Sequence, residues 1–251
     1  MSKGIVLSLF DYTAEALKPW AAAGYECHAF DIQHVDAEPT FENTQFFAGG
    51  GSISYLHADL HDFNTHKDIF MRFDGRKVVL GMAWPVCTDM AVSGAAWFAS
   101  KAKADPNFQT KAVNHATICA DLFDALGVPY MIENPVSVLA TKWRKPDHTF
   151  HPYEFGEYIP EDQGEHPRWP EYIAPFDAYT KKTCQQIRNK WRTDMTDEKA
   201  QLEQRIQYLQ TKLDAYPTGG RPSWVSADIA FDRTAIEVLT KRIAEIERAA
   251  A

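Results

Sequence analysis

Cys87 stands where a cysteine can act as a nucleophile. An apolar run that starts at Val78 predicts a buried strand, the chain then breaks at Pro85, and a helix restarts beyond Ser93-Gly94. In an open α/β sheet that break falls at the carboxyl edge of a strand, where ligands bind. A loop held by a rigid strand is the usual support for a catalytic nucleophile. The alternative is that Cys87 is a small, buried, apolar side chain.

An acid and an amide occupy a comparable position further along the chain. Residues 130–132 form another strand-like run, and Glu133, Asn134 and Pro135 follow it. Because parallel strands end at one edge of a sheet, Cys87 and Glu133 are expected near each other. A carboxyl group buried there keeps its proton more readily and can serve as a general acid. This pairing favours the enzymatic interpretation of Cys87.

The N-terminal residues predict a strand–helix–strand unit. Strands are expected over residues 4–10 and 25–30, with a helix over 14–23 between them. Asp31 then follows Asp11 by twenty residues, which is the geometry in which a carboxylate binds the ribose of a nucleoside. The intervening turn lacks the glycines and the lysine of phosphate-binding loops. A nucleoside cofactor without phosphates therefore fits better than a dinucleotide.

Strands and helices alternate through the first half of the chain. Further strands are expected over residues 53–57, which Asp59 follows, 76–82 and 130–132, helices over 91–103 and 110–126, and an irregular excursion over 36–51 with a flexible Gly49-Gly50-Gly51 tip. This alternation predicts an α/β fold whose sheet is mostly parallel and doubly wound, with helices on both faces.

The second half of the chain differs from the first in its residue composition. Aromatic residues, prolines and histidines crowd residues 141–175, which predicts a loop-rich lid or short hairpin whose rings pack together or stack on bases. Two apolar stripes, at 196–216 and 236–246, predict an antiparallel helical hairpin that covers the core or forms a homodimer. The expected organisation is a catalytic domain over 1–140, a lid segment over 141–192 and a helical hairpin over 193–251.

Composition places the chain among ordinary globular proteins and limits its partners. Of its 251 residues 45% are hydrophobic and 24% charged, and its net charge of −8 argues against a non-specific nucleic-acid coat. A basic run at residues 181–192 is either a solvated surface or a phosphate contact. No stretch reaches the roughly 18 apolar residues of a membrane span and no signal peptide is evident, so a reducing cytoplasm is expected. Cysteines and histidines lack metal-ligand spacing, and we expect no metal.

Taken in order, these fragments resemble the motifs of the DNA cytosine-5 methyltransferase family, particularly its compact phage-type members. The matching fragments, within residues 5–190, are Ser8-Leu9-Phe10-Asp11, Asp31, Asp59, Pro85-Val86-Cys87 with Ser93-Gly94, Glu133-Asn134 and, weakly, Gln186-Ile187-Arg188-Asn189-Lys190. The chain departs from the family in three respects. The first motif lacks its glycines, Val86 replaces the second proline of the catalytic loop, and no large segment suits a target-recognition domain.

The resemblance implies a Rossmann-like class I methyltransferase sheet, with S-adenosylmethionine as the methyl donor. The family's roles would give cofactor binding to Phe10, Asp11, Thr13, Asp31, Ile32, Asp59 and Leu60, and substrate binding to Pro85, Ser93, Asn134, Lys182 and Arg188. Cys87 would add to C6 of a cytosine and so activate C5, while Glu133 would hydrogen-bond to N3. A duplex substrate would have to flip the target base out of the stack.

Three functions follow from these observations. The first is transfer of a methyl or related group to C5 of cytosine in DNA. The second is the same chemistry on a free pyrimidine nucleotide or on single-stranded nucleic acid, which the acidic charge and the missing recognition segment favour. The third is a catalytically silent Rossmann-like domain that recruits a partner through its C-terminal helices, which the missing glycines favour.

Overall fold

The computed structural model describes residues 2–35, 43–165, 170–188, 198–214 and 223–250. The chain divides into two compact units. Unit 1 comprises residues Met1–Trp84, Asn114–Tyr130 and Arg188–Ala251, and unit 2 comprises Pro85–Val113 and Met131–Ile187. The expected boundary at residue 140 falls within unit 2, and the one at residue 192 lies outside the described residues.

Unit 1 contains a mostly parallel sheet. Its strands are β1 (Ile5–Leu9), β2 (Glu26–Asp31), β3 (Thr44–Phe46), β4 (Ser52–His57) and β5 (Val78–Ala83), in the order β3-β4-β2-β1-β5. The pairs β1–β2, β1–β5 and β2–β4 are parallel, and only the β3–β4 pair among these five is antiparallel. Every side chain of β1 is buried, as expected for the central strand of an α/β sheet. The predicted α/β class is confirmed, and the arrangement is compatible with a Rossmann-like fold.

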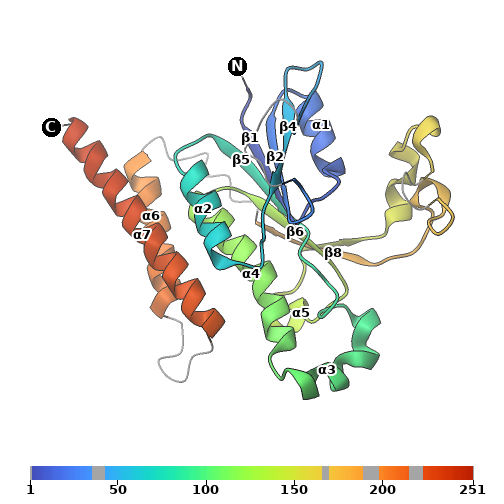
Figure 1. The fold of residues 1–251 in the computed structure, drawn as a ribbon. Coiled ribbons are helices and arrows are strands. Elements are labelled where there is room, and N and C mark those ends of the chain that lie inside the picture. Colours follow the sequence, from blue (N-terminus) through green and yellow to red (C-terminus); the bar gives the residue numbers. More distant parts are fainter. Residues whose placement is uncertain (1, 36–42, 166–169, 189–197, 215–222, 251) are drawn as a thin grey trace. The chain divides into compact units, whose positions relative to one another are not determined.

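Helices cover both faces of this sheet (Figure 1). They are the short helix η1 (Glu15–Leu17), α1 (Lys18–Ala22), α2 (Phe63–Phe73) and α4 (Phe108–Leu126). In Figure 1, α1 lies on one face, while α2 and α4 lie on the other. Helix α4 approaches β5 closely, because a Cβ atom at Gly81 would lie only 2.3 Å from the Phe123 ring. Glycine at this position therefore lets the helix pack directly on the strand.

The predicted C-terminal hairpin is present as α6 (Glu198–Asp214) and α7 (Ser223–Ala250), which lie side by side (Figure 1). Leu209 of α6 and Leu239 of α7 are buried, and α7 also packs on α2. Arg242 reaches Asp74 at the end of α2, with Nη1 3.9 Å from Oδ2. The hairpin thus covers the core of unit 1, while its role in a homodimer stays a prediction.

Unit 2 carries the remaining strands and several short helices. They are β6 (Tyr130–Pro135), β7 (His148–Phe150), β8 (Thr183–Arg188), α3 (Phe98–Ala104), α5 (Leu139–Lys142) and the 3-10 helices η2 (Val92–Trp97), η3 (Pro152–Tyr158), η4 (Glu161–Gln163) and η5 (Pro175–Asp177). Strand β8 lies between β6 and β7 and pairs with β7 antiparallel. The region 141–175, expected to be a loop-rich lid or short hairpin, therefore contains a short strand and 3-10 turns joined by loops.

Several local elements differ from what was expected. The helices expected over 14–23 and 91–103 are present, but each is a 3-10 turn followed by a short α-helix, and β3, α2 and β8 were not anticipated. Of the three glycines after β3, Gly50 is exposed with open space around it, whereas Gly51 is buried and a Cβ atom there would lie 2.2 Å from the Ala21 carbonyl oxygen. Glycine here permits close backbone packing. Residues 36–42 of the expected excursion lie outside the described residues.

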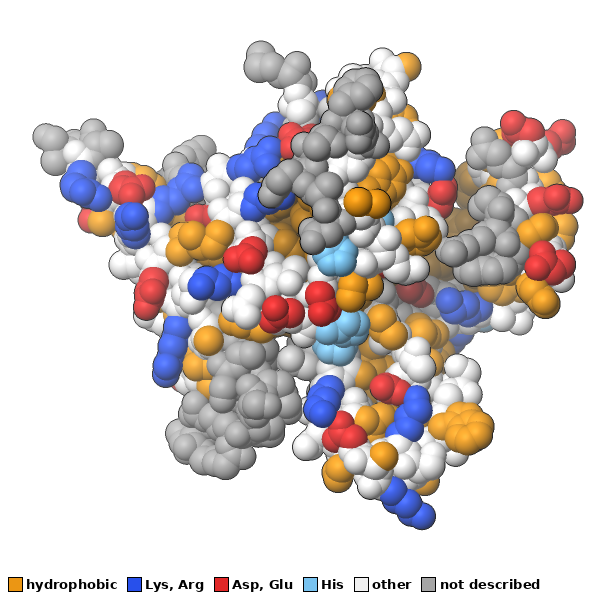
Figure 2. Space-filling view, viewed as in Figure 1, with side chains coloured by type: hydrophobic (Ala, Val, Ile, Leu, Met, Phe, Trp, Pro, Cys, Tyr) orange, Lys and Arg blue, Asp and Glu red, His pale blue; other side chains and the backbone are white. Residues whose placement is uncertain are grey.

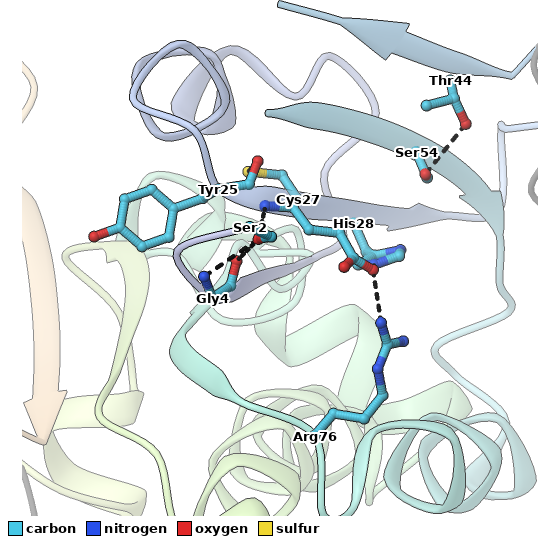
Figure 3. A network of polar contacts seen from close by, with 9 residues as sticks. Ser2, Gly4, Tyr25, Cys27, His28, Thr44, Ser54 and Arg76 are labelled. Carbon is cyan, nitrogen blue, oxygen red and sulfur yellow. Dashed lines mark hydrogen bonds and ion pairs between the residues drawn. The ribbon is translucent and has the colours of Figure 1, made fainter. Parts of the chain in front are cut away.

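A polar network ties the N-terminus to the start of β2 (Figure 3). The Ser2 hydroxyl donates to the Gly4 carbonyl over 2.9 Å and accepts from the Glu26 amide over 3.2 Å. The Glu26 carboxylate accepts from Arg76 and contacts His28 Nε2, each over 2.8 Å. These contacts pin the chain entering β1 against β2.

Candidate functional site

Cys87 lies on a tight turn that begins just after β5. Its carbonyl oxygen accepts from the Met90 amide over 2.9 Å and the Ala91 amide over 2.8 Å, which fixes the turn. The Cys87 side chain is half-buried, whereas Cys27, Cys119 and Cys184 are buried. Burial raises the pKa of each of these three thiols, that of Cys27 to about 12. Since the thiolate is the reactive form, Cys87 is the strongest candidate nucleophile.

Hydrogen bonds attach this turn to the segment that ends β6. Asn134 is fully buried, and its Nδ2 donates to the Pro85 carbonyl oxygen over 3.2 Å. The Val92 amide donates to the Val136 carbonyl over 3.0 Å, and Ala91 forms a bridge with Ser137. Cys87 and the end of β6 are thus parts of one hydrogen-bonded element within unit 2.

Glu133 stands next to Asn134 on β6 with its carboxyl group largely desolvated. Within the described residues its buried Oε1 has no hydrogen-bond partner. Burial raises the pKa of Glu133, and the Lys181 ammonium opposes the rise. The raised pKa favours the neutral acid, which is the form that can donate a hydrogen bond to a ring nitrogen.

The segment that enters β8 supplies the charged and polar groups facing Glu133. Gln185 Nε2 donates to the Met131 sulfur of β6 over 3.1 Å. Tyr179, Lys181 and Cys184 all interact electrostatically with Glu133. The chain just before and at the start of β8 therefore lies beside the last residues of β6.

In unit 1, the three acids expected at strand ends lie where the parallel strands finish. Asp11 follows β1, Asp31 is the last residue of β2, and Asp59 follows β4. Because β1, β2 and β4 are parallel neighbours, the acids share one edge of the sheet. Asp31 Oδ1 accepts from the Gln33 amide over 2.9 Å, and Asp59 Oδ1 accepts from the His61 amide over 3.0 Å.

A cavity of about 320 Å³ opens beside the end of β1. Its lining residues are Phe10, Asp11, Tyr12, Thr13, Glu15, Ala16 and Trp84. Phe10 and Ala14 adopt φ values of 58° and 55°, a conformation that residues other than glycine seldom take. The Asp11 carboxylate holds the turn by accepting from the Ser8 hydroxyl over 2.6 Å and the Ala14 amide over 2.8 Å. Such strain concentrates at functional sites.

The structure brings some predicted residues together and separates others. Phe10, Asp11 and Thr13 line the cavity of unit 1, Leu60 is buried and Ile32 is exposed. In unit 2, Pro85 is buried and bonded to Asn134, whereas Ser93 and Lys182 are exposed. Arg188 pairs with Asp124 in unit 1, whereas Cys87 and Glu133 lie in unit 2.

Three contributions to these sites were not anticipated. Trp84 donates from Nε1 to the Ser8 hydroxyl over 3.0 Å and so extends the hydrogen bonds of Asp11. The Lys181 charge lowers the pKa of Glu133, and the basic run at 181–192 was its only sequence signal. His34 joins the cavity turn to β4 through its ring nitrogens, and no motif marked it. In Figure 2, histidine side chains lie near the middle of the face shown, with acidic side chains beside them.

Comparison with models of known protein families finds no match. Comparison with curated protein sequences finds none either. Across the part of the chain that the structure describes, no three histidine, cysteine or acidic side chains group closely enough to hold a metal ion. The helices described here also include none that is long and apolar enough to cross a membrane.

Proposed function

We propose that the chain transfers a methyl group from S-adenosylmethionine to C5 of a cytosine in nucleic acid. The observation that carries the proposal is the hydrogen-bonded element that joins the Cys87 turn to the end of β6, where Glu133 is desolvated. A thiol and a carboxyl group whose raised pKa favours its protonated form, both on one hydrogen-bonded element, match the two demands of this chemistry. One attacks the ring, and the other stabilises the charge that develops on it.

The chemistry at the ring follows from the roles of these two residues. The Cys87 thiolate forms a bond to C6, and the C5–C6 π electrons move so that C5 becomes nucleophilic. Glu133 donates its proton toward N3, which receives the displaced charge. Methyl transfer to C5 would break the donor's S–CH3 bond and release a neutral thioether. Loss of the C5 proton to solvent then re-forms the C5–C6 double bond and expels the thiolate. The cycle therefore regenerates free Cys87 and requires Glu133 to recover its proton.

The cavity at the end of β1 has the chemistry of a site for the donor. Aromatic Phe10, Tyr12 and Trp84 together with acidic Asp11 and Glu15 line it, and aromatic faces beside carboxylates attract onium cations. Its volume of about 320 Å³ is at the lower end of ligand pockets. When bound, S-adenosylmethionine would supply an electrophilic methyl group on a sulfonium.

Exposed aromatic residues favour a polymeric substrate over a free nucleotide. Tyr158 and Tyr172 are 75% and 82% exposed, and Tyr153 and Phe155 are also exposed. Some of these rings touch, as in the Phe155–Tyr158 pair with centroids 6.5 Å apart, but their outer faces stay in solvent. Bases of a nucleic acid strand can stack on such rings. The expected packing of these rings among themselves is therefore only part of their role.

A covalent trap tests the proposed nucleophile directly. A cytosine that carries fluorine at C5 cannot lose a proton there, so the adduct with Cys87 accumulates after methyl transfer. We expect wild-type protein, donor and a 5-fluorocytosine oligonucleotide to give a denaturation-resistant complex, with the linkage at Cys87 by mass spectrometry. Cys87→Ala should give none, whereas Cys119→Ala should still form it. A complex of equal yield with Cys87→Ala would refute the mechanism.

The substrate class is tested by comparing labelled methyl transfer to deoxycytidine monophosphate, single-stranded DNA and duplex DNA. Transfer to DNA should weaken steeply as salt rises, because phosphate contacts release counterions. Efficient, salt-independent transfer to the mononucleotide would instead identify a nucleotide-modifying enzyme.

A further inference from the structure

His34 joins two parts of unit 1 through both nitrogens of its ring. Nδ1 lies 3.1 Å from the Leu56 carbonyl oxygen of β4, and Nε2 lies 3.0 Å from the Tyr12 carbonyl oxygen in the cavity turn. The His34 side chain is buried, with only 9% of its surface exposed. The ring stacks on Tyr12 at 5.8 Å and meets Tyr55 edge-on at 5.4 Å.

The chemistry of these two contacts fixes the protonation state of the ring. A backbone carbonyl oxygen only accepts hydrogen bonds, so each ring nitrogen must donate an N–H. A neutral imidazole has one N–H, whereas an imidazolium has two. Both bonds can therefore exist together only when His34 carries a positive charge.

We infer that His34 is a positioning residue that acts as an imidazolium, whose two N–H groups hold the Tyr12 and Leu56 carbonyls and so shape the donor cavity. This inference rests on the proposed function in so far as the cavity binds the donor. The Tyr12 carbonyl belongs to the strained turn between Phe10 and Ala14. Holding that carbonyl against β4 supplies an external restraint that such a turn needs.

The groups around the ring suit a positive charge. The carboxyl groups of Asp11 and Asp31 lie on the neighbouring strand ends, and the Asp31 carbonyl oxygen accepts from the His34 amide over 3.3 Å. His57 contacts the His34 carbonyl oxygen through Nδ1 over 3.1 Å. Burial raises the pKa of Asp11, and its bonds to Ser8 and Ala14 and the charge of His34 oppose that rise. Tyr12 and Tyr55 present ring surfaces, which attract cations.

Loss of the proton has a defined consequence for the cavity. In a ring that carries only one N–H, one of the two carbonyls has no donor, and the Tyr12 turn is held on one side only. Donor affinity should then fall about fivefold to tenfold. This is part of the effect of one lost hydrogen bond to a charged group, because the bond acts on the ligand only through the turn.

Nitrogen NMR of protein with labelled histidine tests the protonation state without any ligand. At pH 7.5 both ring nitrogens of His34 should carry a proton, and the His34→Gln variant should identify the signals. A His34 ring with a single proton from pH 5.5 to 8 would overturn the inference.

Calorimetric titration with S-adenosylmethionine from pH 6 to 9 tests the role in binding. An amide side chain presents N–H groups on one side only, so His34→Gln should bind about fivefold more weakly at pH 6.5 and lose the pH dependence of wild type. His148→Gln, an exposed histidine on β7, should match wild type. Equal affinities for wild type and His34→Gln would remove the positioning role. If wild type binds no donor at any pH, both the proposed function and this positioning role are refuted. The NMR experiment tests the protonation state of His34 independently of that outcome.

Discussion

At the scale of single residues, position along the sheet separates Cys87 from the other cysteines. The sequence placed Cys87 after a strand, and the structure leaves it half-buried on a fixed turn while Cys27, Cys119 and Cys184 are buried. The exposure of Cys87 was predictable because a proline ends the strand, so that the residues after it form a loop at the edge of the sheet. The importance of Lys181 was not predictable, because its effect depends on which acid lies across from it.

Glu133 should set the alkaline limit of activity. Burial raises its pKa, so the neutral acid persists to higher pH than an ordinary carboxyl group allows. Activity should fall as pH rises through that raised pKa, because the ionised form cannot donate to N3. Glu133→Gln should reduce the turnover rate about 100-fold or more and remove this limb of the pH profile. Glu157→Gln, at an exposed lid position, should keep both the rate and the profile.

Lys181 and Lys182 offer a matched pair of variants. The Lys181 charge lowers the pKa of Glu133, whereas Lys182 acts on Cys184. Lys181→Ala should therefore move the alkaline limb of the pH profile upward, and Lys182→Ala should leave it in place. Measuring the turnover rate of both variants from pH 6 to 10 checks this. Equal profiles for the two variants would contradict the assignment of Lys181 to Glu133.

At the scale of elements, helix α2 and strand β8 were missed because each buries polar side chains, which a hydropathy pattern counts as exposed. Helix α2 buries His66 together with Ile69, Phe70 and Phe73, a helical spacing that disappears when histidine is counted as a surface residue. Strand β8 buries Thr183 and Gln186, the latter 1% exposed. Strand β1 was predictable because its apolar run is buried on both faces.

Asn134 holds the Cys87 turn onto β6, so its loss should loosen both. Asn134→Ala removes the donor to the Pro85 carbonyl and leaves a buried oxygen unpaired, at a cost of about 1–3 kcal/mol in the free energy of unfolding. Urea unfolding should show this loss, and alkylation of Cys87 by iodoacetamide should become faster. Asn107→Ala, at an exposed position before α4, should change neither quantity. Slower alkylation in Asn134→Ala would mean that the bond exposes the thiol instead of positioning it.

At the scale of the whole molecule, each half of the proposed reaction belongs to one compact unit. The acids at the ends of β1, β2 and β4 and the donor cavity lie in unit 1, whereas Cys87 and Glu133 lie in unit 2. The sequence predicted the alternation that builds the sheet, because hydrophobic runs and strand-end acids are local signals. It could not predict the two units, because residues 114–130 and 188–251 return to unit 1 through contacts that are distant in sequence.

Global stability should decline in acid through groups remote from the chemistry. Burial lowers the pKa of His66 from 6.5 to about 4 in the folded chain. Between these values the unfolded chain binds a proton that the folded chain does not, so the free energy of unfolding falls as pH drops from 6.5 to 4. The loss from His66 is at most about 3 kcal/mol. The hydrogen bond with His28 and the pairing with Arg76 lower the pKa of Glu26 from 4.5 to about 2, so its contribution disappears below pH 4.5.

Urea unfolding at pH 7.5, 6.5, 5.5 and 4.5 isolates the contribution of His66, because that of Glu26 is lost only below this range. His66→Gln removes the titrating ring and should flatten the decline between pH 6.5 and 4.5, whatever its stability at pH 7.5. His148→Gln removes an exposed histidine and should reproduce the wild-type slope. Glu26→Gln should be less stable than wild type at pH 7.5, because the carboxylate that accepts from Arg76 is lost. A wild-type free energy of unfolding that stays constant from pH 7.5 to 4.5 would show that His66 takes up its proton in the folded chain as readily as in the unfolded one.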